Sequence, residues 1–137
     1  MDSPLVNAPV NASGLGIAAS LLAGLAVAAG AFGAHGLRGQ LDPAALSTFE
    51  TAARYQLVHS LAAAFAADRA GRQGAAMAAR AAGLFVAGAV LFSGSLYVLA
   101  LGGPPLAGVI TPLGGLAFMA GWLLLALSFR GRRTAAS

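Results

Sequence analysis

The stretch GLGIAASLLAGLAVAAGAFGA, residues Gly14–Ala34, decides the fold class of this chain. It holds no charged residue, and Ser20 is its one polar side chain. A helix needs about 20 apolar residues to cross the hydrocarbon core of a bilayer, so this run is long enough to span. It exceeds the core of a typical signal peptide, and no arginine or lysine precedes it. We therefore expect an uncleaved membrane helix.

The composition of the whole chain agrees with a membrane environment. Of the 137 residues, 58% are hydrophobic and 9% are charged, whereas soluble domains carry about a quarter charged residues. So few charges would leave large apolar patches exposed to water, which soluble monomers avoid. We expect one membrane domain over residues 1–137, with lipid as the surrounding medium.

Polar breaks divide the chain into further apolar runs. We expect an all-α integral membrane bundle of four transmembrane helices, at approximately 14–35, 48–67, 81–101 and 106–129. Two starts are open for the second helix: Asp42 with Pro43 suits an N-cap, and Ser47 with Glu50 fits a capping box. We expect a polar turn over 68–74, and Pro112 should kink or interrupt the fourth helix.

The positive charges predict the orientation. All eight basic residues are arginines, and they lie at the ends of apolar runs rather than in one patch, which argues against a nucleic-acid partner. Short loops rich in arginine stay on the cytoplasmic side. The second loop and the C-terminal tail hold six of them: Arg69, Arg72, Arg80, Arg130, Arg132 and Arg133. We expect both termini to be cytoplasmic.

Polar side chains near or within the apolar runs form a candidate cluster, because such groups are costly in a membrane. Its members are His35, Glu50, Arg54, Tyr55, Gln56, His59, Ser93, Ser95, Tyr97 and Thr111. Glu50 and Arg54 stand four residues apart, so an ion pair along one helix face is one interpretation, and an interfacial or capping role for Glu50 is the other. Tyr55 and His59 lie roughly on the opposite face.

The chain's two histidines raise the question of a cofactor. His35 and His59 are expected on the same side of the membrane, with His59 about one turn into the hydrocarbon, so their imidazoles have a chance to approach each other. Paired imidazoles can ligate haem or a transition metal. No carboxylate or thiolate completes a ligand set, however, and cysteine is absent. We therefore predict no metal site and no cofactor, with each histidine hydrogen-bonded near a helix end.

The hydroxyl groups favour structure over catalysis. Ser93, Ser95, Tyr97 and Thr111 have no histidine and carboxylate arranged beside them that would activate a nucleophile. Hydrogen bonds between helices are the more economical interpretation. We predict no catalytic residues and no enzyme activity.

Four motifs in order resemble one family. They are GAFGAHGLRGQL (30–41), FETAARYQLVHSLA (49–62), LFSGSLYVLAL (91–101) and TPLGGLAFMAGWLLLA (111–126). Together they resemble the domain-of-unknown-function 423 family, which is related to the transmembrane protein 256 family. The resemblance implies a small multi-pass protein of a bacterial plasma (inner) membrane or a mitochondrion, without a reaction or ligand to transfer. The arginine-only, alanine-rich composition favours a bacterium.

Two functions of different classes follow from the sequence. The first is an accessory or scaffold subunit that binds a lipid, a larger membrane protein complex or further copies of itself. The second is a small oligomeric transporter or channel that uses Glu50, Arg54, Tyr55 and His59. A water-accessible cavity reaching Glu50 and His59 would favour transport, whereas sealed side chains would favour the scaffold.

Overall fold

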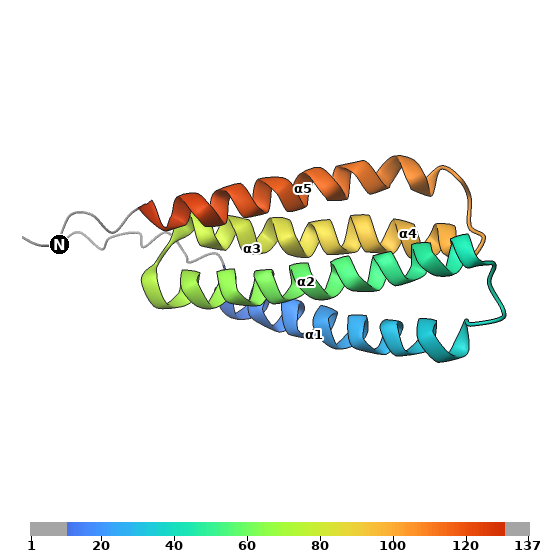
Figure 1. Cartoon of the computed structure of the whole chain (residues 1–137). Helices are drawn as coiled ribbons and strands as arrows, with labels where there is room; N and C mark the ends of the chain where they lie inside the picture. Colours follow the sequence, from blue (N-terminus) through green and yellow to red (C-terminus); the bar gives the residue numbers. More distant parts are fainter. Residues whose placement is uncertain (1–10, 131–137) are drawn as a thin grey trace, which may run out of the picture.

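The computed structural model describes residues 11–130, which form four antiparallel helical rods and no strand (Figure 1). The rods contain α1 (Ala12–Ala31) with the π-helix η1 (Phe32–Gly36); α2 (Pro43–Gln73); α3 (Ala76–Gly88), η2 (Ala89–Ser93) and α4 (Gly94–Ala100); and α5 (Ala107–Ser128). The all-helical, four-rod architecture predicted from the sequence is confirmed. The first residue of α1 and the last of α5 lie at the same end of the bundle (Figure 1).

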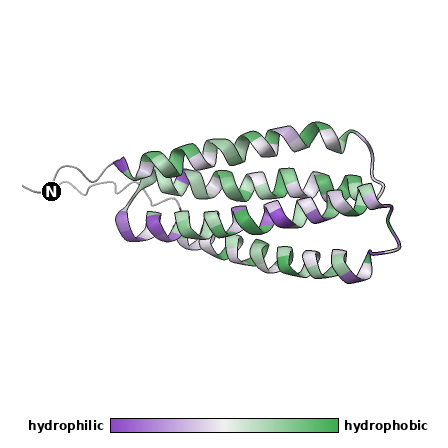
Figure 2. Ribbon diagram, in the orientation of Figure 1, coloured by the Kyte–Doolittle hydropathy of each residue, from purple (hydrophilic) through white to green (hydrophobic). Residues whose placement is uncertain are grey.

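Three of the rods are long and apolar enough to cross a membrane, namely Ala12–Gly36, Ala76–Ala100 and Ala107–Ser128. The rod α2 is not among them, because the polar and charged side chains along it lower its hydropathy. Figure 2 shows hydrophilic residues along α2, while the other rods are mainly hydrophobic. The most polar rod is nevertheless the one with the most buried residues, and it packs against α1, α3 and α4.

The boundaries of α2 differ from the expected 48–67 at both ends. The helix begins at Pro43, where Asp42 Oδ1 accepts hydrogen bonds from the backbone N–H groups of Ala44 and Ala45. Of the two open starts, the structure therefore has the Asp42 cap. The expected polar turn over 68–74 is wrong, because α2 continues to Gln73 and ends at Gly74, whose φ of 60° suits a glycine cap.

The fourth rod is continuous through its proline. Pro112 lies inside α5 near its beginning, and the helix runs on to Ser128, so the expected interruption is wrong. The third rod instead carries the irregularity: it widens into η2 where it faces α5. At this contact a Cβ on Gly114 would lie 2.4 Å from the backbone N of Phe92, so the two rods touch backbone to backbone.

The core between the rods is built from very small side chains. Ala19, Ala63, Ala66, Ala81 and Ala82 lie in one apolar cluster with almost no exposed surface. Phe85 and Phe118 are the large side chains of the same cluster. Methyl groups facing each other let the helices approach closely, which is how membrane bundles gain van der Waals contact without a hydrophobic driving force.

Candidate functional site

The ten predicted polar residues do not form one cluster. The structure separates them into a hydrogen-bonded bridge, a hydroxyl pair, an aromatic stack and a group at the loop end of the bundle. We call these the Gln56 bridge, the Ser95 pair, the His59 stack and the loop-end group, and describe each below. Spacing along a helix predicts neighbours on that helix, but not which rod each face contacts.

The Gln56 bridge joins three rods. Gln56 of α2 is 6% exposed, and its Nε2 donates to the carbonyl of Leu22 in α1 at 2.8 Å. Its Oε1 accepts from the hydroxyl of Tyr97 in α4 at 2.9 Å. The amide thus has partners on both sides, as a buried polar group requires. These two hydrogen bonds hold α2 at one position along its axis relative to α1 and α4.

The Ser95 pair joins the third and fourth rods. Ser95 Oγ and Thr111 Oγ1 lie 2.6 Å apart, and Ser95 Oγ also donates to the carbonyl of Phe92 at 2.9 Å. With the carbonyl accepting from Ser95, the Thr111 hydroxyl donates across the interface. The neighbouring Ser93 is different: its hydroxyl is fully buried and has no hydrogen-bond partner among residues 11–130, a condition it shares with Ser60 of α2.

The His59 stack lies at the middle of the bundle. The imidazole of His59 lies flat on the ring of Phe118, with centroids 3.5 Å apart and planes 13° apart. Tyr55, Phe85 and Trp122 surround it with ring centroids at 5.7, 5.9 and 6.0 Å. Phe118 is near the centre of α5, so His59 lies at mid-length of the bundle. Its depth in a membrane, expected to be about one turn, stays a prediction.

The loop-end group consists of His35, Glu50 and Arg54. Neither His35 with His59 nor Glu50 with Arg54 forms a pair. His35 is exposed in η1, at the end of the bundle that holds the loop between α1 and α2. Gly33 of η1 lies against Phe49 of α2, ten residues before His59, so helix rise places the two histidines about 15 Å apart along the axis. The expected approach of the two imidazoles is therefore wrong.

Glu50 and Arg54 also remain separate. The ion pair found within residues 11–130 joins Arg72 to Asp68, and none joins Glu50 to Arg54. Glu50 is half-buried beside Gly33, whereas Arg54 is exposed. In the same part of the chain, no three histidine, cysteine, aspartate or glutamate side chains gather as metal ligands would.

Arg69 is a buried residue of α2, although its sequence context predicts a turn at the bundle end. It is 8% exposed, and its Nε and Nη2 donate to the Ser128 Oγ and carbonyl oxygen at 3.0 and 2.9 Å. The guanidinium also lies 3.8 Å above the Phe129 ring. Arg69 therefore binds the C-terminal carbonyl end of α5, where a cation is favoured. Ala62 and Ala66, seven and three residues before it, share its helix face, and this run of small residues is the sequence signal for an inward side chain.

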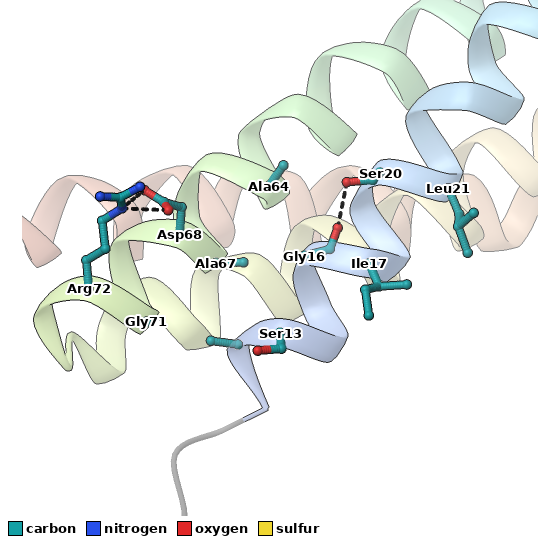
Figure 3. Close-up of a pocket in the computed structure, with 11 residues that line it drawn as sticks. Ser13, Gly16, Ile17, Ser20, Leu21, Ala64, Ala67, Asp68, Gly71 and Arg72 are labelled. Carbon is teal, nitrogen blue, oxygen red and sulfur yellow. Dashed lines mark hydrogen bonds and ion pairs between the residues drawn. The ribbon is translucent and has the colours of Figure 1, made fainter.

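Among the surface grooves beside these residues, two are wide enough and suitably lined to hold a partner or a ligand. The first, which we call the α1/α2 groove, has a volume of about 570 Å³ and is lined largely by small residues, with Ser13, Gly16, Ser20, Ala64 and Gly71 among them (Figure 3). Arg72 and Asp68 lie at its end, their atoms 2.7 Å apart, and this contact raises the pKa of Arg72 above its ordinary value. The second, the aromatic groove, has a volume of about 500 Å³ and opens beside His59 between α2 and α5.

Comparison with known proteins identifies the family. The family described as "Protein of unknown function (DUF423)" matches residues 29–115, which span the end of the first rod through the first turns of α5. The chain belongs to this DUF423 family. The match contains Gln56 and Tyr97, the Ser95 pair and His59. Leu22 of the Gln56 bridge lies before it, and Phe118 and Trp122 of the His59 stack lie after it.

Curated relatives of this DUF423 protein are named as membrane proteins. It is 42% identical over 107 residues to the UPF0382 membrane protein YwdK of Bacillus subtilis, covering 76% of this chain and 85% of that one. It is 39% identical over 99 residues to the UPF0382 inner membrane protein YgdD of Escherichia coli, covering 72% and 76%. No solved structure matches the chain. The chain is a membrane protein of this family.

Proposed function

We propose that this protein is an accessory or scaffold subunit of the bacterial inner membrane, which crosses the bilayer four times and binds a larger membrane protein. The observation that carries the proposal is the solid interior of the bundle. Ala63, Ala66, Ala81 and Ala82 fill the contact between α2 and α3 with almost no exposed surface. A core of touching methyl groups leaves no room for a column of water.

The fourth crossing rests on the packing of α2 along α1. Gly16, near the start of α1, faces Ala67 of α2, and Gly33, near the end of the first rod, faces Phe49. The two rods therefore lie side by side over almost the whole length of the first. Since the first rod has the length and hydropathy of a membrane span, we propose that α2 crosses with it. Gln56, His59 and Ser60 near its middle are buried among the rods, whereas Arg54 is exposed.

Transport lacks comparable support. The residues that would line a path are in different environments: His59 is 7% exposed under Phe118, while Arg54 is exposed on another face of α2. Glu50 has no hydrogen bond to either of them within residues 11–130. The burial of His59 and its separation from Glu50 and Arg54 support the scaffold over a continuous path.

The α1/α2 groove is the proposed seat for a transmembrane helix of the partner. Small residues on both walls permit close approach of a third helix backbone. The Asp68 and Arg72 side chains at its end are exposed and present both charge signs at the membrane boundary, where polar groups of a partner's flanking loop would meet them. Ser20 donates its hydroxyl to the carbonyl of Gly16 at 2.8 Å, so this hydroxyl needs no donor–acceptor partner on an incoming helix.

Photocrosslinking in living cells tests this proposal. A photoreactive residue is placed at Ser20 on one wall and, in a second strain, at Gly71 on the other, and the crosslinked proteins are identified by mass spectrometry. We expect both positions to capture the same membrane protein. Ala120 of α5, which is exposed on another rod, is the matched control and should not capture it.

A groove-filling variant completes the test. Ser20→Phe should reduce the Gly71 crosslink at least about fivefold, whereas Ala120→Phe should leave it unchanged. Different proteins at the two positions, lipid adducts alone, or a crosslink to a second copy of this chain would overturn the proposal of a hetero-partner helix in this groove.

A further inference from the structure

The aromatic groove combines features of a binding site for a small, lipid-soluble ring compound. Its walls are Tyr55 and His59 of α2, Phe92 of η2, and residues of α5 that include Phe118, Met119 and Trp122. Its volume of about 500 Å³ lies within the range of small-molecule pockets. Because the groove lies at the middle of the bundle, a ligand reaches it from the lipid phase.

His59 supplies the groove with one polar atom. Its Nδ1 lies 2.8 Å from the carbonyl of Tyr55, and since a carbonyl oxygen accepts, Nδ1–H is the donor. In the neutral imidazole, Nε2 then carries a lone pair. Nε2 has no hydrogen-bond partner among residues 11–130, yet it is not one of the enclosed unpartnered atoms there, which are the hydroxyl oxygens of Ser60 and Ser93. It therefore opens toward the groove that His59 lines.

We propose that the aromatic groove binds a lipid-soluble hydroquinone, whose hydroxyl donates to His59 Nε2 while its ring packs among the aromatic side chains. The direction of the hydrogen bond sets the selectivity. A hydroxyl is a donor and satisfies the lone pair, whereas the oxidised quinone offers two acceptor carbonyls. Binding a quinone at Nε2 would require moving the proton from Nδ1 and losing the bond to Tyr55. The reduced form is therefore the one that satisfies His59 Nε2.

The surrounding rings support a planar ligand over an aliphatic alcohol. Tyr55 and Phe92 have centroids 4.9 Å apart, and His59 and Trp122 meet edge to face at 6.0 Å. Aromatic rings favour such offset and edge-to-face contacts with further rings. Trp122 is the one tryptophan of the chain, so its fluorescence reports occupancy of this groove.

The test uses the full chain in lipid nanodiscs under anaerobic conditions. The probes are 2-decyl-1,4-hydroquinone, its dimethyl ether, which has the same ring without a donor, and the corresponding quinone. Binding is followed by Trp122 fluorescence and by equilibrium dialysis. We expect saturable binding of the hydroquinone, with the dimethyl ether and the quinone at least about fivefold weaker, the value of one neutral hydrogen bond.

Nitrogen NMR of histidine-labelled protein tests the contact atom without a mutation. The chain has two histidines, so the spectrum holds few enough signals for the Nε2 resonance of His59 to be followed. The hydroquinone should shift the Nε2 resonance of His59, and the ether should not. His59→Phe keeps a stacked ring and should remove the preference for the hydroquinone, whereas His35→Phe should retain it. Equal binding of all three probes, or an unchanged His59 Nε2 resonance at saturation, would overturn the proposal.

Discussion

The imidazole of His59 and the ring of Phe118 stack 3.5 Å apart at the centre of the bundle. Like the hydrogen bonds from Arg69 to Ser128, this contact joins α2 directly to α5. We expect Phe118→Leu to lower the free energy of unfolding by about 1–2 kcal/mol, since the smaller side chain leaves a void against His59. Reversible unfolding in mixed detergent micelles measures it. Leu123→Ala on the exposed face of α5 is the control, and an equal loss there would contradict the assignment.

Gly114 marks the closest approach of two backbones. A Cβ at this position would lie 2.4 Å from the N atom and 2.7 Å from the Cα of Phe92, so Gly114→Ala must separate α5 from η2. We expect a loss of about 1–3 kcal/mol in unfolding free energy from this overpacking. Gly94→Ala is the matched control, because a Cβ there meets nothing within 4 Å. Its stability should be unchanged or slightly higher.

Gln56 and Tyr97 provide a direct measure of one buried hydrogen bond. A double-mutant cycle with Gln56→Leu and Tyr97→Phe should give a coupling energy of about 0.5–1.5 kcal/mol, typical of hydrogen bonds between membrane helices. The Gln56→Leu variant alone should cost more than Tyr97→Phe, because it removes the contact to Leu22 as well. Strictly additive effects would show that the two side chains do not share this bond.

The contribution of Arg69 to stability is expected to depend on the planar shape of its guanidinium as well as on its charge. Lysine cannot donate simultaneously from two fixed positions to Ser128, so Arg69→Lys should lower the unfolding free energy by about 1 kcal/mol. Arg72→Lys should leave it nearly unchanged, because Arg72 and Asp68 form an exposed surface pair. Thermal unfolding of both variants in one detergent checks the difference. Equal effects would argue against the buried cap.

The rods were predictable from the sequence because hydropathy acts over about twenty residues at a time. The run 106–129 and the helix Ala107–Ser128 agree closely. The rod α2 was harder, since its apolar part is shorter than its helix: Asp42 caps it early, and Arg69 is held inward by Ser128. Hydropathy indicates which medium surrounds a segment, but it does not indicate where the backbone hydrogen bonds of a helix begin and end.

The candidate site was predictable residue by residue but not as an arrangement. Gln56, Ser95, Tyr97 and Thr111 stand out in the sequence as polar groups in apolar surroundings, and the structure finds partners for each. Their partners lie 16 to 41 residues away, beyond the reach of helical spacing. Nothing in the sequence marks Phe118 and Trp122 as neighbours of His59, because aromatic residues of a membrane helix face lipid more often than they face a histidine.

Membrane topology is the most direct test of the central claim that all four rods cross the bilayer. The chain has no cysteine, so single cysteines at Gln40, Gln73 and Pro105 report each connection between rods when intact cells are treated with a membrane-impermeant maleimide. We predict labelling at Gln40→Cys and Pro105→Cys in intact cells and at Gln73→Cys after lysis alone. Labelling of Gln40→Cys and Gln73→Cys from the same side would show that α2 does not cross and would contradict the account.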